Sequence, residues 1–146
     1  MAIANLHETL LSYTMRKNQL NLEITQLQSQ KTLVMRSQGD AQELCNVRKS
    51  DIRSHFKDLY ENDPELQVKY SDYTEIPEYE EEIDALEAEI NAQLDELTNW
   101  ETELDAQITV NSTELEEINA YMDSIKSMLS SNVQEDFNYG LNKPNK

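Results

Sequence analysis

The stretch that decides the fold runs from Glu78 to Ser131 and reads EYEEEIDALEAEINAQLDELTNWETELDAQITVNSTELEEINAYMDSIKSMLSS. Every seventh residue from Ile83 forms a row in which six of eight positions are apolar: Ile83, Ile90, Leu97, Leu104, Asn111, Ile118, Ile125 and Asn132. A seven-residue apolar repeat of this length is typical of helices that pack along a shared seam. The 54 residues therefore predict one helix of roughly 80 Å.

A second apolar row lies between the positions of the first and is split between two neighbouring positions. Its members are Leu86, Leu94, Trp100, Ile108, Leu115, Tyr121, Met122, Met128 and Leu129. Because Trp100 falls in this row, we expect it to pack in the core rather than to anchor a partner. Both rows keep their phase across the β-branched and cap-forming residues 109–113, so we expect a continuous or gently kinked helix through Asn111. A break near Asn111 is the alternative.

Residues 2–37 predict a second seam helix, because their apolar positions alternate in steps of three and four. Gly39 and Asp40 then have the chemistry of a helix terminator and a new N-cap, before a shorter amphipathic helix at 41–61. The alternative is one helix that continues through a bend at Gly39.

The segment 62–77 predicts a corner that reverses the chain. Asn62-Asp63-Pro64 has the order of an N-cap followed by proline at the first helical position, which opens a short helix as far as Tyr70. Ile76 precedes Pro77 and is therefore expected in an extended conformation. Four tyrosines surround the corner, and we favour a role in capping the end of the hairpin over contact with a partner: Tyr60, Tyr70, Tyr73 and Tyr79.

These segments predict an all-α fold, an elongated antiparallel helical hairpin or coiled coil with one long C-terminal helix. Residues 1–138 would form a single helical domain with its corner near 62–77, and residues 139–146 a flexible tail. A two-helix hairpin buries only one stripe of each helix, which leaves apolar residues for assembly. The candidate interface residues are Leu10, Ile24, Leu27, Ile83, Ile90, Leu97, Trp100, Leu104, Ile118 and Ile125.

The charge is strongly uneven along the chain. The chain has 12 Lys and Arg against 29 Asp and Glu, for a formal net charge of −17. Residues 1–69 contain nine basic and nine acidic side chains, whereas residues 70–125 contain 18 acidic and no basic ones. Such a surface repels nucleic acid and anionic lipid, so we expect neither as a partner. The carboxylates form either a solvated face that keeps the protein in solution or a docking face for a basic partner.

Few residues carry the patterns of an enzyme or a metal site. The two glycines fit neither a phosphate-binding loop nor a helix-loop calcium site. Neither histidine follows a glutamate by three residues, as carboxylate-bridged dimetal sites on helices require. Cys45 is interpreted as a small semi-buried hydrophobic residue. We therefore expect no catalytic residue, no metal, no cofactor and no small-molecule substrate.

The chain starts without a charged leader and apolar core, and no apolar run approaches the length of a membrane span. The expected location is the cytoplasm, where a single cysteine suits the reducing conditions. Secretion that needs no signal peptide stays open as an alternative.

The function expected from these features is that of a non-catalytic structural or protein-protein interaction protein, a helical assembly subunit or scaffold. Its partner would be a second copy of itself or another helical protein. In architecture alone, the expected hairpin resembles the hairpin subunits of secreted filaments and long-helix chaperones. That resemblance implies two alternatives: a holdase-type long-helix chaperone, or a secreted filament subunit without a classical signal.

Overall fold

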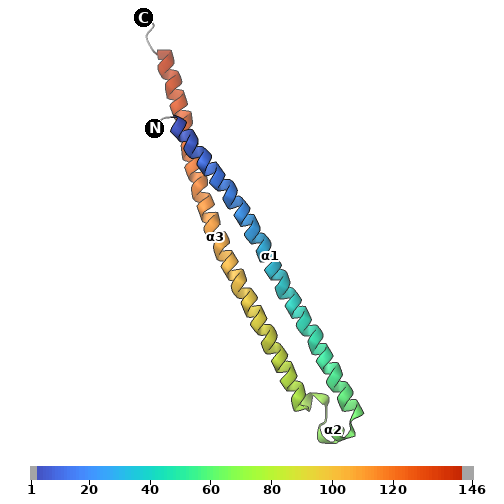
Figure 1. Ribbon diagram of the computed structural model, residues 1–146. Helices are drawn as coiled ribbons and strands as arrows, with labels where there is room; N and C mark the ends of the chain where they lie inside the picture. Colours follow the sequence, from blue (N-terminus) through green and yellow to red (C-terminus); the bar gives the residue numbers. More distant parts are fainter. Residues whose placement is uncertain (1–2, 143–146) are drawn as a thin grey trace. The chain divides into compact units, whose positions relative to one another are not determined.

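The structure is a computed structural model that describes the backbone of residues 3–142 and the side chains of residues 3–135. Its elements are α1 (Ile3–Asn62), α2 (Pro64–Lys69), the 3-10 turn η1 (Tyr73–Glu75) and α3 (Pro77–Asn142) (Figure 1). The part of the chain that is described contains no strand. Helix α1 packs antiparallel against α3, which confirms the predicted all-α helical hairpin with one long C-terminal helix.

The chain divides into two compact units. Unit 1 comprises Met1–Ser29 and Leu104–Lys146, and unit 2 comprises Gln30–Glu103. Each unit pairs a segment of α1 with a segment of α3, and the corner belongs to unit 2.

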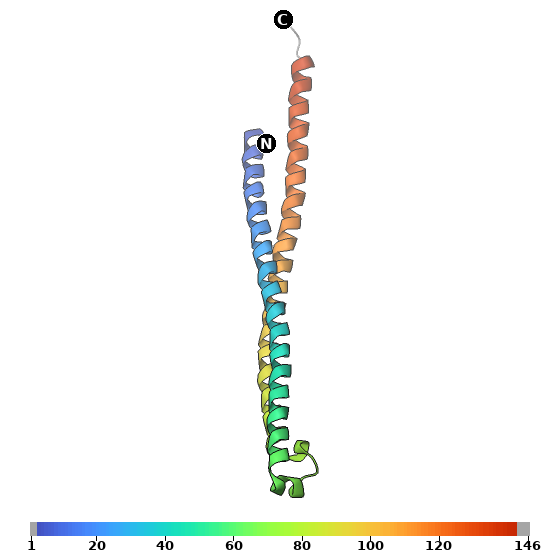
Figure 2. The ribbon, with the colours of Figure 1, turned by 90° about the vertical axis from the view of Figure 1, so that its right-hand side faces the viewer.

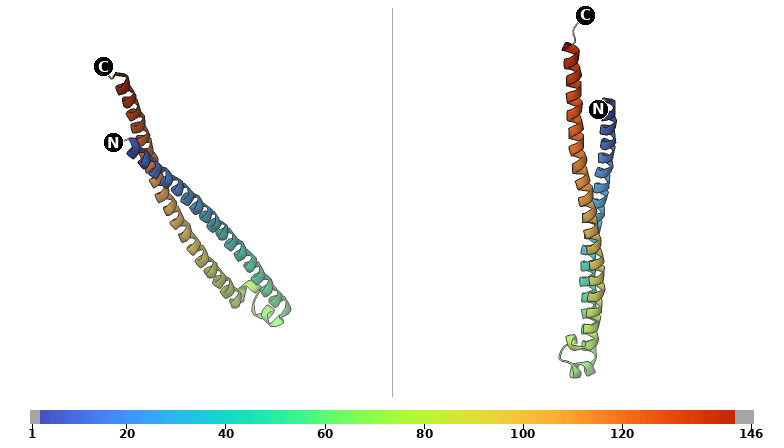
Figure 3. Two further views of the ribbon diagram at one scale, coloured as in Figure 1. Left: turned by 45° about the horizontal axis from the view of Figure 1, so that its top comes forward. Right: turned by 90° about the vertical axis from the view of Figure 1, so that its left-hand side faces the viewer.

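The core of unit 1 is a seam between the first part of α1 and the last part of α3, whose antiparallel course is visible in Figure 3. Its two clusters are Leu6 with Ile125 and Leu129, and Leu20 with Ile118 and Met122. Tyr13 packs against both clusters and stacks on Tyr121 at a centroid distance of 5.7 Å. Each fully buried aliphatic side chain stabilises the pair by about 1.5–3 kcal/mol relative to exposure.

The core of unit 2 is centred on Cys45, Leu86 and Ile90, with Ile52 and Leu94 packed against them. Cys45 is a buried free thiol, in agreement with its interpretation as a small hydrophobic residue. Phe56 and Ile76 extend the buried set toward the corner, where they are 4 % and 5 % exposed.

Short-range side-chain chemistry forms the corner of unit 2, which is visible in Figure 2. The carboxylate of Asp63 accepts a hydrogen bond from the backbone N–H of Glu65, and Pro64 occupies the first turn of α2. Asp72 caps η1 in the same way through the N–H of Tyr73 at 2.8 Å. Ile76 is extended, with φ −67° and ψ 122°, as expected for a residue before proline. The predicted cap, proline position and extended residue are all confirmed.

The tyrosines hold the corner together. The Tyr60 hydroxyl lies 3.1 Å from the carbonyl oxygen of Tyr70 and 3.0 Å from that of Ser71. Tyr79 packs edge-on against both Phe56 and Tyr73, each at a centroid distance of 5.6 Å. These contacts agree with the capping role that the sequence favours.

Two helix boundaries differ from the expected ones. Gly39 lies inside α1, so the helix does not end there, and the alternative of a continuous helix is correct. Helix α3 runs through Asn111, as expected, but continues past residue 131 to Asn142. Of the expected tail, residues 139–142 belong to α3, and residues 143–146 lie outside the described residues.

Candidate interaction site

The predicted interface residues lie mostly in the hairpin's own seam. Four are buried: Ile90, Leu104, Ile118 and Ile125. Five are half-buried: Leu10, Ile24, Leu27, Ile83 and Leu97. The buried ones stabilise the fold from within and present no surface to a partner.

Trp100 is the exception, and its predicted place in the core is wrong. Its side chain is 51 % exposed. A step of seven from Leu94 reaches Glu101, which is half-buried and accepts a hydrogen bond of 3.1 Å from the Gln38 side-chain amide. Because consecutive helical residues point about 100° apart, the residue before Glu101 faces away from the seam.

In unit 1, too, only one of two adjacent residues of the second apolar row is buried in the seam. Met122 and Leu129 are buried at 6 % and 9 % exposure, whereas Tyr121 and Met128 are 53 % and 51 % exposed. In these repeats of the second row, one of two neighbouring positions lies in the seam and the other at the surface, whereas Leu86, at the position equivalent to Trp100, is buried. The surface positions leave apolar side chains available for contacts.

Polar pairs across the seam set the register within each unit. In unit 1 the Arg16 guanidinium donates to both carboxylate oxygens of Glu114, and the Asn111 amide lies 3.4 Å from Glu23 Oε2. The Arg16 hydrogen bonds hold the pKa of the Glu114 carboxyl below its usual range.

Lys49 and Arg48 form ion pairs of the same kind in unit 2. Lys49 Nζ lies 2.7 Å from Glu87 Oε1, and this contact raises the pKa of the lysine. Arg48 Nη1 lies 3.4 Å from Glu89 Oε2. Sequence reasoning missed these pairs, although oppositely charged residues beside an apolar seam are a known signal of interhelical pairing.

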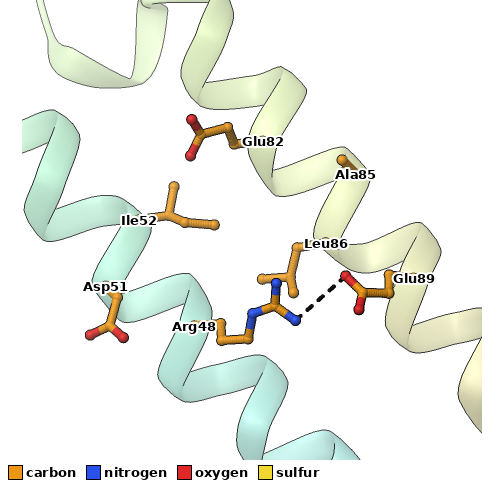
Figure 4. A pocket seen from close by; sticks show the side chains of 7 residues that line it. All are labelled: Arg48, Asp51, Ile52, Glu82, Ala85, Leu86 and Glu89. Atoms are coloured by element: carbon orange, nitrogen blue, oxygen red, sulfur yellow. Dashed lines mark hydrogen bonds and ion pairs between the residues drawn. The ribbon is translucent and has the colours of Figure 1, made fainter.

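A groove opens along one side of the seam in unit 2 (Figure 4). It has a volume of about 400 Å³ and is lined by Arg48, Asp51, Ile52, Glu82, Ala85, Leu86 and Glu89. Ile52 and Leu86 supply apolar surface, and the charged side chains surround them. The groove is shallow and open to solvent, unlike the enclosed pockets that hold small molecules.

The outer face of α1 carries further apolar residues in both units. In unit 1, Leu11, Met15 and Leu22 follow one another by four and seven residues and are each about 60 % exposed. Steps of four and seven place side chains on one face of a helix. These three exposed residues, which we call the α1 outer stripe, do not belong to the buried clusters of unit 1.

The described residues contain no group of three or more His, Cys, Asp or Glu side chains that could hold a metal ion. Within the same part of the chain, no helix has an apolar stretch long enough to span a bilayer. The fold and the exposed faces thus define an antiparallel helical hairpin with exposed apolar and acidic side chains. The chain matches no protein-family model, and no curated protein and no solved structure is significantly similar to it.

Proposed function

We propose that this protein is a non-catalytic helical scaffold or assembly subunit that binds helices of a second copy or of another helical protein. The observation that supports the proposal most is the exposure of large apolar side chains at helical spacing. Each unit uses one stripe of α1 and one of α3 for its own core, and a pair of helices offers no further interior.

The distribution of these side chains favours assembly along the helices over a chaperone clamp. A holdase of this shape would concentrate apolar surface at the corner, and there Val68 is 90 % exposed. Its neighbours Leu66 and Ile76 are half-buried and buried, so Val68 stands alone. Isolated apolar residues are normal on protein surfaces, whereas a helical stripe such as Leu11, Met15 and Leu22 is a contact surface.

Sedimentation equilibrium over a wide range of protein concentrations tests the proposal in its homomeric form. We expect species larger than the 17.0 kDa chain. Replacing Met15 and Leu22 of the α1 outer stripe with glutamate should shift the protein toward monomer. A matched control replaces Gln19 and Gln26, which are exposed and polar, with glutamate.

A strictly monomeric protein that is also cooperatively folded would contradict self-association. Helical content that increases only after a partner is added would instead support the heteromeric form of the proposal.

A further inference from the structure

The groove in unit 2 belongs to a larger surface along the same side of the seam. Glu82 and Glu89 line the groove from α3, and steps of seven from them reach Glu96 and Glu103. Seven residues are close to two helical turns, so the four glutamates lie along one side of α3. Among them Glu89 is paired with Arg48, whereas Glu82, Glu96 and Glu103 are exposed and have no cationic partner among the side chains of residues 3–135.

Apolar side chains accompany this row of carboxylates. Trp100 follows Glu96 by four residues and precedes Glu103 by three, which places it on the same side of α3. On α1, Leu44 precedes the groove residue Arg48 by four and is 50 % exposed. The hydrogen bond between Gln38 and Glu101 brings Gln38, six residues before Leu44 on α1, level with Trp100. We call the combined surface the groove face; its residues are Leu44, Ile52, Glu82, Ala85, Glu96, Trp100 and Glu103.

We propose that the groove face binds a basic amphipathic helix of another protein. Apolar residues of that helix would cover Leu44 and Trp100 and enter the groove over Ile52. Lys or Arg residues repeated every seven positions would lie opposite Glu82, Glu96 and Glu103. This inference rests on the proposed function, because it assumes that the protein binds helices.

The charge of the surface favours a basic helix over a second copy. Residues 77–103 contain eleven Asp and Glu and no Lys or Arg. Two copies joined through their groove faces would bring these carboxylates together, and like charges in close proximity are destabilising. A helix with a row of Lys or Arg would instead meet complementary potential, which favours association and sets its register.

Trp100 provides a direct measurement, because it is the only tryptophan in the chain. The binding probe is a synthetic peptide of about four heptads, with Leu at the two seam positions, Lys at the flanking positions and no tryptophan. We expect a saturable blue shift of the Trp100 emission when this peptide is added. A matched peptide with Glu at the flanking positions should leave the emission unchanged.

Two charge-matched variants locate the site. The pair Glu96→Lys and Glu103→Lys changes the groove face, whereas Asp84→Lys and Asp95→Lys makes the same change of charge on another side of α3. We expect the first pair to weaken peptide binding about tenfold, and the second to change it by about twofold or less. Circular dichroism checks whether both variants are as helical as the parent protein.

Equal weakening by the two variants would mean diffuse attraction to an acidic protein and would overturn the proposal. Absence of a blue shift with the lysine peptide would overturn it as well. An emission that is blue-shifted without peptide and shifts to the red on dilution would assign the face to a second copy. In each case the sedimentation measurement still decides whether the protein assembles, so the proposed function can stand when this site fails.

Discussion

Arg16 and Glu114 form a two-point contact across the seam of unit 1. Arg16 Nε donates to Glu114 Oε1 at 2.8 Å, and Nη2 donates to Oε2 at 2.9 Å. The two side chains are 37 % and 38 % exposed, so water screens the pair and limits its energy. The paired geometry nevertheless specifies which residues of α1 and α3 face each other.

We expect Glu114→Gln to lower the Tm slightly at pH 7. Because the pKa of Glu114 is lowered in the folded state, its contribution is present above the unfolded value of about 4.3. The contribution disappears as the pH falls through the lower folded pKa. The Tm difference between parent and variant should therefore narrow in acid.

The control for this prediction is Glu116→Gln, since Glu116 is exposed and has no cationic partner among the side chains that the structure describes. An equal Tm decrease in both variants, or a difference that persists in acid, would show that the Arg16 contact contributes nothing measurable.

Gly39→Ala should stabilise the protein. Gly39 lies within α1, and a methyl group added there would meet no atom within 4 Å. Alanine in an exposed helix interior is favoured over glycine by about 1 kcal/mol. Urea denaturation should show a higher midpoint for the variant, and Gly39→Pro should lower it strongly. An unchanged or lower midpoint for Gly39→Ala would indicate that the helix bends at this glycine in solution.

The capping interactions of the corner could be predicted from the sequence, whereas the continuation of α1 through Gly39 could not. Asp63 and Pro64 form their cap from adjacent residues, so the sequence contains the whole arrangement. Gly39 costs the helix about 1 kcal/mol, and the seam continues beyond it through Cys45 and Ile52. Packing along the seam outweighs the local preference of one residue. The prediction that the helix ends at Gly39, which was based on the glycine alone, was therefore wrong.

The side of the helix on which Trp100 lies could not be predicted from α3 alone. Either of two adjacent residues, Trp100 or Glu101, could lie in the seam, and Glu101 is the less apolar of the two. Gln38 on the opposite helix satisfies the Glu101 carboxylate, and this partner depends on the axial register of α1 and α3. Periodicity predicts which face is buried but does not predict that register, so the groove face was missed.

Ile90→Asp should test the fold rather than the assembly. Ile90 is 3 % exposed and packs with Cys45 and Leu86, so a carboxylate there would be buried without a partner. We expect a loss of about 3 kcal/mol or more in the free energy of unfolding. The control Val47→Asp lies in the same unit at 52 % exposure and should cost about 1 kcal/mol or less. Similar urea midpoints for the two variants would contradict the seam described for unit 2.

Salt should stabilise the folded protein. Residues 70–125 contain 18 Asp and Glu and no Lys or Arg, and like charges at helical spacing each cost a few tenths of a kcal/mol. Sodium chloride shortens the screening length from about 10 Å at 0.1 M to about 3 Å at 1 M. Added salt weakens both the repulsion between carboxylates and the attraction within the exposed ion pairs. We expect the first effect to be the larger, so the Tm should rise by several degrees. Protonation as the pH approaches the sequence pI of about 4.3 should act in the same direction.

The variant Glu81→Gln with Asp84→Asn has less repulsion between carboxylates to relieve and should show a smaller rise in Tm with added salt. A Tm that falls with added salt would mean that a basic surface already neutralises these carboxylates, and a basic partner that purifies with the protein would be the first candidate for that surface.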